Sequence, residues 1–249
     1  MGGKQSKVYS DSSKILSVAL DPTSGFHTTL STRLLLNQTA YADACALHVL
    51  HKFPPNVIVD SNELKDRGFV FELQGPADLE LPVVAVEQTD VWLLLNLNAS
   101  STFKEIKEVG EDDGGGAREI TVNVPLHMRY SEPTMGGPSH EQVPIEPPRA
   151  FWACPADPSL SHLPESLPDV PAELHTAFAL ASPRFNLIPP ADGVELRPMT
   201  MRVPAGDLTH LPLVQIGTAA VVFLAAGWLT RRIYVASQAL RAAHEKKEE

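Results

Sequence analysis

The chain has 249 residues, of which 43% are hydrophobic, so it can form a sizeable core in one domain of about 200 residues with an appendage, or in two small domains. This composition excludes a wholly disordered protein. The formal net charge of −10 argues against a nucleic-acid-binding protein, because such proteins normally present a basic face.

The first 25 residues are polar, and we expect them to form a poorly ordered N-terminus. They begin MGGKQS, in which Gly2 and Ser6 fit the pattern for N-myristoylation, a cytosolic modification. They contain no apolar segment typical of a signal peptide. A luminal domain would therefore need export driven by its own membrane span, or a start upstream of Met1.

Many short strand-like runs follow, at spacings of about ten residues, within a domain that we place at residues 26–205. The predicted strands are residues 27–37, 44–53, 57–59, 69–73, 91–97, 120–130, 150–154 and 194–203. One short helix is expected over residues 61–67, begun by Asp60 or Ser61 and ended by Gly68. This spacing predicts a mainly β fold, an antiparallel β-sandwich.

Three segments between these strands are expected to lack strands. Gly110–Arg118 is predicted to be a flexible loop, and residues 133–148 a Pro-rich irregular segment. Residues 155–190 are predicted to be a long Pro-rich surface insertion with one short helix near residues 172–180.

A membrane span is predicted at residues 211–229, LPLVQIGTAAVVFLAAGWL, because these 19 residues contain no charge. Trp228 lies where an interfacial aromatic side chain is expected. The alternative is a buried core helix. With a single span, the lipid bilayer becomes one of the partners of this chain.

The charges around this span predict its orientation. The twenty residues before it hold only Arg197 and Arg202 as basic residues, whereas the tail at residues 230–249 is more basic. The basic residues of the tail are Arg231, Arg232, Arg241, Lys246 and Lys247. By the positive-inside rule the tail is cytosolic and the N-terminal domain is luminal or outside the cell.

Two further signals agree with this orientation. Asn37 and Asn98 stand in N-glycosylation sequons, which are used only on the luminal side. Lys246 and Lys247, four and three positions from the end of the sequence, resemble the dilysine signal that retrieves membrane proteins to the endoplasmic reticulum (ER). The alternative for these lysines is an ordinary solvated charge run.

We find no pattern typical of a catalytic or cofactor site. The sequence has no phosphate-binding G-x-x-x-x-G-K-[ST] loop after a strand, no G-x-S-x-G and no H-E-x-x-H. His48 and His51 would point to opposite faces of a strand, so we interpret them as ordinary histidines. Glu111-Asp112-Asp113 is interpreted as an acidic loop. We therefore predict a protein that is not an enzyme, without metal or cofactor.

Four segments together resemble the PIG-X family. They are CALHVLHKFPPNVIVDSNELKDRG, VPLHMRYSEP, FWAC and MRVPAGDLTHLPLVQIGT, in the order in which the family has them, over roughly residues 27–229. Residues 155–190 match poorly. The first and third segments contain Cys45 and Cys154, the only two cysteines. They could form one disulfide in an oxidising compartment, whereas a cytosolic domain would keep two buried thiols.

The resemblance implies a single-pass ER membrane protein with a luminal β-domain. It further implies a non-catalytic subunit that stabilises a multi-spanning, PIG-M-like mannosyltransferase. That enzyme, glycosylphosphatidylinositol (GPI) mannosyltransferase I, would transfer the first mannose from dolichol-phosphate-mannose to the glucosaminyl-phosphatidylinositol precursor. The alternative function is a tail-anchored cytosolic adaptor, with a myristoyl group on Gly2 as a second tether.

Overall fold

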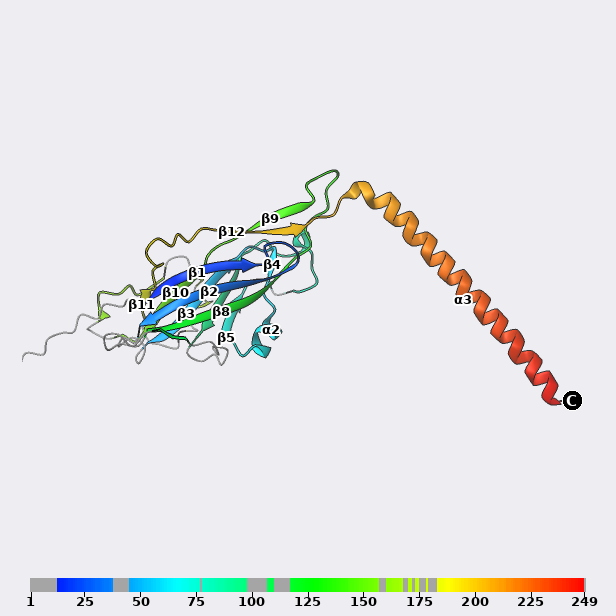
Figure 1. Cartoon of the computed structure of the whole chain (residues 1–249), viewed down its shortest axis with the longest axis horizontal. Helices are drawn as coiled ribbons and strands as arrows, with labels where there is room; N and C mark the ends of the chain where they lie inside the picture. The colour runs from blue at the N-terminus through cyan, green and yellow to red at the C-terminus, as the bar shows by residue number, and fades with distance from the viewer. Residues whose placement is uncertain are drawn as a thin grey trace, which may run out of the picture. The chain divides into compact units, whose positions relative to one another are not determined.

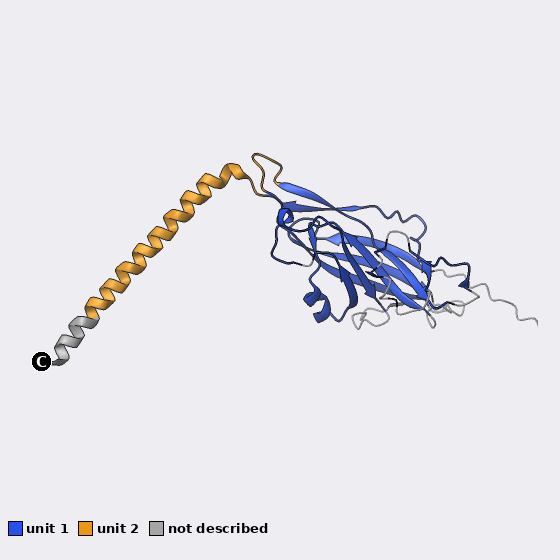
Figure 2. Ribbon diagram, turned by 180° about the vertical axis from the view of Figure 1, so that it is seen from behind, with its two compact units in different colours: residues 1–132, 140–205 blue, residues 133–139, 206–249 orange. Residues whose placement is uncertain are grey.

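The structure is a computed structural model that describes residues 13–37, 45–76, 78–97, 107–109, 117–156, 160–167, 170–171, 173–174, 178 and 183–248. Its contacts divide the chain into two compact units, coloured separately in Figure 2. Unit 1 comprises residues 1–132 and 140–205, and unit 2 comprises residues 133–139 and 206–249.

Unit 1 is built from antiparallel β-sheets (Figure 1). The first sheet has the order β1 (Lys14–Asp21), β2 (His27–Asn37), β8 (Ala117–Met128), β4 (Val57–Ile58), and β7 (Lys107–Val109) also pairs with β8. The second sheet has the order β11 (Arg184–Leu187), β10 (Arg149–Cys154), β3 (Ala46–Phe53), β6 (Val91–Asn96), β5 (Val70–Gln74). The strands β12 (Met199–Pro204) and β9 (His140–Ile145) form a separate two-stranded sheet. The predicted mainly β, antiparallel fold is confirmed.

The main core lies between the first two sheets. On β2 every second side chain is buried, so Leu30 and Leu34 point inward from the first sheet. They belong to the same apolar cluster as Phe53, Leu93 and Leu95 of the second sheet. Burying each such side chain stabilises the fold by about 1.5 to 3 kcal/mol, so this layer is the principal source of stability in unit 1.

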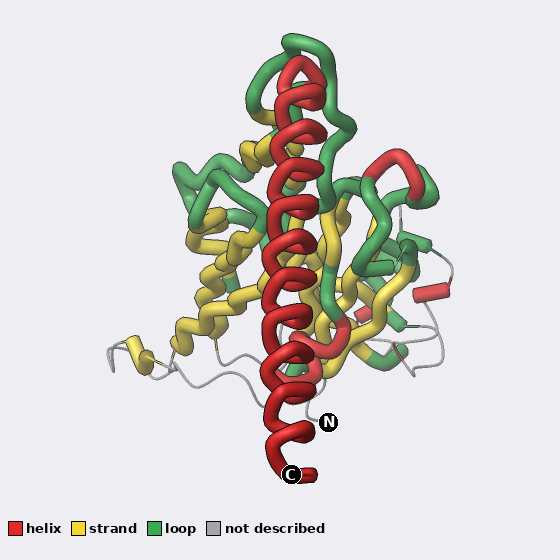
Figure 3. Tube along the Cα trace, turned by 90° about the vertical axis from the view of Figure 1, so that its right-hand side faces the viewer, coloured by secondary structure: helices red, strands yellow, loops and turns green. Residues whose placement is uncertain are grey.

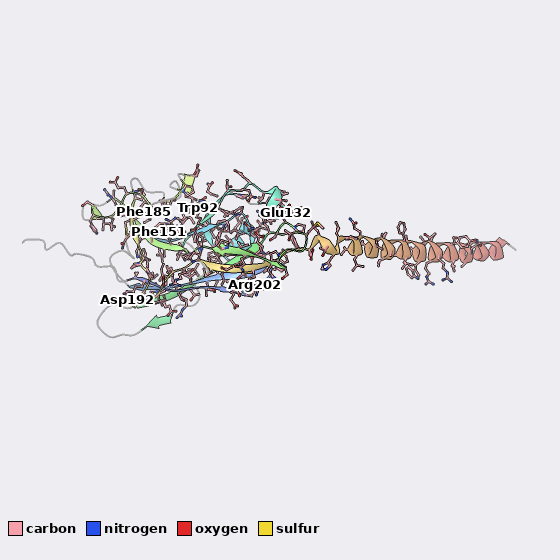
Figure 4. All side chains as sticks on the ribbon, turned by 90° about the horizontal axis from the view of Figure 1, so that it is seen from above. Trp92, Glu132, Phe151, Phe185, Asp192 and Arg202 are labelled. Atoms are coloured by element: carbon pink, nitrogen blue, oxygen red, sulfur yellow. A yellow bond between two sulfur atoms is a disulfide. The ribbon has the colours of Figure 1, made fainter. Side chains whose placement is uncertain are left out.

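A second, smaller core covers the outer face of the second sheet. Phe151 of β10 is fully buried there against Phe185 of β11, with the ring centroids 5.7 Å apart. Figure 4 shows these two residues and Trp92 on one side of unit 1, with Asp192 and Arg202 on the other. The remaining buried members of this cluster are Leu50, Leu94, Ala153, Leu167, Leu174 and Phe178.

The described residues between 155 and 190 therefore do not form the surface insertion that the sequence predicted. Leu167, Leu174 and Phe178 are buried against the sheet, and β11 adds a strand to it. These side chains pack in one cluster with Phe151 and Phe185, which keeps both aromatic rings out of water. The helix expected near residues 172–180 lies largely outside the described residues.

Two other expectations need correction. Residues 14–21, expected within a poorly ordered N-terminus, form β1, because Ile15 and Leu20 are buried in the main core. The segment expected to be irregular contains β9, in which Pro144 pairs with Thr200. In the part of the chain that the structure describes, β9 pairs with β12 alone, so it is an edge strand, where a residue without an N–H group is tolerated.

The short helix α2 (Ser61–Asp66) follows β4 directly, as predicted. Its N-cap is Asp60, whose Oδ1 accepts hydrogen bonds from the backbone N–H groups of Asn62 and Glu63. Gly68 follows with φ +78°, a conformation in which glycine is favoured, and so ends the helix. A single 3₁₀ turn, η1 (Val83–Ala85), precedes β6.

Unit 2 consists of the 3₁₀ turn η4 (Leu208–His210), the long helix α3 (Leu211–Glu248) and residues 133–139. Asp207 Oδ1 accepts hydrogen bonds from the N–H groups of Thr209 and Gly136, and so ties the loop to the start of the helix. The 38 residues of α3, drawn in red in Figure 3, span about 57 Å. The helix thus continues through most of the segment expected to be the tail.

Within the described residues, one helical segment is long and apolar enough to cross a membrane, Leu208–Ala239. Its side chains are exposed, including Leu213 and Phe223 at 76% and 77%. A soluble helix buries its apolar face, so this exposure is consistent with a lipid-facing span.

Candidate functional site

The two cysteines lie side by side in the second sheet. Cys45 precedes β3 and Cys154 ends β10, and these two strands pair with Ala46 opposite Ala153. Their sulfur atoms form a disulfide with an S–S distance of 2.03 Å across 109 positions of sequence. Both residues are buried, so this bond is an internal part of unit 1.

A pocket of about 230 Å³ lies in unit 1 where β4 leads into α2. Its lining combines apolar, aromatic and titratable side chains. These are Phe26, His27, Ile58, Asp60, Leu79, His127, Met128 and Tyr130. The residues lie at or next to the start of β2, the end of β4 and the end of β8, except Leu79, which lies between β5 and η1. The pairing of these three strands therefore creates most of the pocket.

A chain of hydrogen-bonded side chains borders this pocket. His27 and His127 are direct partners across β2 and β8, and their Nδ1 atoms are 2.7 Å apart. On its other side, the His127 ring contacts Glu63 of α2, with Nε2 2.8 Å from Oε2. Arg67 donates to the other oxygen of Glu63 at 2.7 Å.

This arrangement restricts where protons can lie. When both rings are neutral and His127 donates its Nε2–H to Glu63, its Nδ1 must accept the Nδ1–H of His27. Desolvation opposes ionisation of Glu63, but the hydrogen bonds and charges of His127 and Arg67 together lower the pKa of its carboxyl. Glu63 is therefore a carboxylate that holds the histidine pair in place.

Arg129, next to the pocket-lining Met128, is fully buried. Its guanidinium donates to four backbone carbonyls, those of Pro55 (3.0 Å), Pro76 (3.4 Å), Asp78 (2.5 Å) and Leu81 (2.9 Å). Burial lowers the pKa of Arg129, and the charge of Asp78 opposes that change. The side chain stays charged, since guanidinium is not deprotonated in proteins. It fixes the segment from Pro76 to Leu81 onto the end of β8.

Three exposed apolar or aromatic side chains lie in this segment, in η1 and after β8. Leu79, Val84 and Tyr130 are exposed at 47%, 61% and 69%. The Tyr130 ring packs on Phe26 with a centroid distance of 4.8 Å, and the N–H of Val83 donates to the carbonyl of Tyr130. The backbone of Tyr130 is thus held by a hydrogen bond, while its side chain is exposed.

The histidines of β3 lie on opposite faces, as their odd spacing predicts. His48 packs against Phe151 and Phe178 in the smaller core, whereas His51 stacks on Phe53 in the main core. Both are buried. Within the described residues, no group of three potential ligands could hold a metal ion.

The other residues singled out from the sequence are not fully described. Asn98, Gly2, Ser6 and residues 111–113 lie outside the described residues. Asn37 ends β2, opposite Ala117, and only its backbone is described. Lys246 and Lys247 lie in α3, again described for the backbone alone.

The family model described as PIG-X / PBN1 matches residues 23–234, which is most of the chain. The chain belongs to the PIG-X / PBN1 family. Among curated relatives it is similar to Protein pbn1 of Neurospora crassa, with 30% identity over 235 residues, covering 86% of this chain and 42% of that protein. With Protein PBN1 of Gibberella zeae it shares 26% identity over 233 residues, covering 88% of this chain and 43% of that protein.

The chain thus spans about two-fifths of the length of the curated relatives that it matches. No solved structure matches it. The PIG-X / PBN1 match includes both cysteines, the pocket, Arg129 and most of the candidate span, but ends before Lys246 and Lys247.

Sequence reasoning missed the histidine pair and the role of Arg129. His27 and His127 are 100 positions apart, and only the register of β2 and β8 brings them together. Arg129 does stand in the segment VPLHMRYSEP, where a charged residue directly after an apolar strand was a usable signal.

Proposed function

We propose that this protein is a non-catalytic subunit in GPI-anchor biosynthesis at the ER membrane. Its role is to stabilise the multi-spanning mannosyltransferase that adds the first mannose to the GPI precursor. The observation that carries the proposal is the PIG-X / PBN1 match over residues 23–234, which joins the β-domain to a candidate span.

The architecture supports a division of labour between two proteins. Transfer of a sugar between two lipid-linked substrates requires a site within or beside the membrane, whereas the described chain has one candidate span. A catalytic partner would supply that site. The present chain would contribute α3 within the bilayer and the β-domain outside it, and contacts with both would stabilise the partner.

Three features support a luminal β-domain with a cytosolic C-terminus. The disulfide between Cys45 and Cys154 is of a kind that persists in oxidising compartments such as the ER lumen. Arg231 and Arg232 follow the apolar part of α3, which agrees with the positive-inside rule. The sequons at Asn37 and Asn98 are consistent with the same orientation.

The test is deletion of the gene followed by analysis of radiolabelled GPI precursors. We expect glucosaminyl-phosphatidylinositol to accumulate, mannosylated precursors to fall and the level of the mannosyltransferase to decrease. Re-expression of the 249-residue chain should reverse all three changes. Normal mannosylation in the deletion strain would overturn the proposal.

The two parts of the proposal can also be separated. If mannosylation fails while the mannosyltransferase stays at its normal level, the chain acts in the pathway but not as a stabiliser. Over-expression of the mannosyltransferase in the deletion strain gives the complementary test. A purely stabilising subunit should then become partly dispensable.

A further inference from the structure

We infer that the pocket between β2, β4 and β8 binds a cationic side chain, an arginine or a lysine, presented by a partner protein. The inference concerns unit 1 alone and does not rest on the proposed function.

The charges around the pocket favour a cation. Asp60 is the one carboxylate in the lining, and its Oδ1 accepts the two bonds that cap α2. Its Oδ2 has no partner within the described part of the chain, which leaves it available to a ligand. Glu63 lies behind the lining, but its charge is already paired with Arg67, so Asp60 carries the negative charge that is available to a ligand.

No lysine or arginine is among the described residues that line the pocket. The two nearby guanidinium groups are already engaged, Arg67 by Glu63 and Arg129 by four backbone carbonyls. A phosphate or another anion would therefore meet the carboxylate of Asp60 without a free guanidinium or ammonium group to bind it, which is unfavourable. This argues against the headgroup of an anionic lipid as the ligand.

The remaining lining suits the stem of a long basic side chain. Ile58, Leu79 and Met128 provide apolar contacts for methylene groups. Tyr130 and Phe26 offer aromatic faces, which attract guanidinium and ammonium groups. When the histidines are neutral in the arrangement described above, His27 keeps Nε2 as a further acceptor.

The size of the pocket and the charge of the domain indicate a side chain on a protein rather than a free molecule. At about 230 Å³ the pocket is smaller than the roughly 300 to 1,000 Å³ of typical ligand sites, so one side chain fits it better. Residues 1–210 also hold 27 of the 30 acidic residues of the chain, against 15 basic ones. Such a surface attracts a basic partner surface.

The experiment uses the full chain, purified in neutral detergent micelles and labelled with ¹⁵N-histidine. N-acetyl-argininamide and N-acetyl-lysinamide are titrated while the ring signals of His27 and His127 are followed. We expect saturable shifts with a Kd in the millimolar range, and none with inorganic phosphate. The variant Asp60→Asn should weaken binding about tenfold, because it loses a charge-assisted hydrogen bond.

Asp60→Asn is a suitable probe because asparagine caps a helix as well as aspartate does, so α2 should remain intact. The matched control is Glu72→Gln, which removes an exposed charge from β5 in the other sheet. The control should leave the Kd unchanged. Equal effects of the two variants would show attraction by net charge alone and would overturn the assignment, as would the absence of saturable binding.

A final titration tests whether the cation belongs to an amino sugar rather than to a protein side chain. Glucosamine carries an ammonium group on a sugar ring, and N-acetylglucosamine is its neutral counterpart. If glucosamine binds more than tenfold tighter than N-acetyl-argininamide, the pocket is a site for an amino sugar, and the assignment to a partner side chain is overturned. Comparable or weaker binding of glucosamine supports it.

Discussion

The guanidinium of Arg129 and the backbone carbonyl of Leu81 are joined by a 2.9 Å hydrogen bond, although the two residues lie 48 positions apart. This bond and three others to backbone carbonyls hold the segment beside the pocket, so a single buried side chain determines the shape of one pocket wall.

We predict that Arg129→Ala destabilises unit 1 by about 3 to 5 kcal/mol, because it removes a large buried side chain together with its hydrogen bonds to four backbone carbonyls. Arg129→Lys should lose less, since lysine keeps the charge but lacks the planar fork of donors. Denaturant unfolding of the purified chain measures both. The control Arg197→Ala removes an exposed arginine paired with Glu195 and should change the stability by less than about 0.5 kcal/mol.

The disulfide gives a second prediction. A loop of 109 positions contributes roughly 4 to 5 kcal/mol in the chain-entropy model, which is comparable with the whole stability of a modest domain. Cys45→Ser, Cys154→Ser and the double variant should therefore each lower the steady-state level of the protein, and of its partner with it. Mass spectrometry without reduction should find one linked peptide pair. Two alkylatable thiols in the native protein would contradict the bond and weaken the luminal assignment.

The buried histidines of β3 predict a loss of stability in acid. Burial lowers the pKa of His51 to about 3, and neither ring nitrogen has a partner within the described residues. The pKa of His48 is lowered to about 4, chiefly by burial and despite a hydrogen bond with the Leu95 backbone. Unfolded histidine titrates near 6.5. Between the folded and unfolded values the unfolded state binds more protons, so stability falls as the pH falls below about 6.5.

The slope should reach about 1.4 kcal/mol per pH unit for each histidine, as measured by denaturant unfolding between pH 7 and pH 4. His51→Leu should reduce that slope by about 1.4 kcal/mol per pH unit, the contribution of one histidine. The exposed His162 provides the matched control, and His162→Gln should leave the slope as it is. An unchanged slope in His51→Leu would show that other groups cause the acid sensitivity.

The proposed orientation predicts N-glycosylation at Asn37 and Asn98. Endoglycosidase H should increase the gel mobility of the protein, and Asn37→Gln with Asn98→Gln should abolish that change. In sealed microsomes, added protease should spare residues 1–210. Digestion of this part, together with unchanged mobility, would indicate a cytosolic domain and support the myristoylated alternative.

The lysines near the end of the sequence predict retrieval to the ER. Lys246→Ser with Lys247→Ser should allow part of the protein to reach the Golgi, detected by Golgi-type processing of its glycans. Arg241→Ser serves as a comparison, because it removes a positive charge from a different part of the tail, away from the end of the span. If the lysine variant stays in the ER, binding to the partner is the retention mechanism.

The sequence allowed prediction of those elements whose signals are local. The strand at β2 and the cap at Asp60 follow from alternation and from helix-start chemistry within a few residues. β1 and β11 were missed because their burial depends on distant partners. β1 pairs with β2, and Phe185 of β11 packs on Phe151. Neither contact can be recognised from the residues next to it in the sequence.

The pocket could not be predicted for the same reason. His27, Asp60 and His127 come from three segments, and only the order β2–β8–β4 brings them together. The span was predicted from its length and lack of charge, which are local properties. The family was predicted from the four segments that resemble PIG-X. The periodicity of apolar residues alone predicts only the fold class.

The disulfide also determines what a protease can release. A single cut anywhere between Cys45 and Cys154 leaves two pieces that remain covalently joined through sulfur. β1 and β2 lie on the N-terminal side of any such cut, whereas Cys154 and the whole of α3 lie on the other side. A nicked molecule would therefore keep its N-terminal strands attached to the helix that we assign to the membrane, until a reductant separates them.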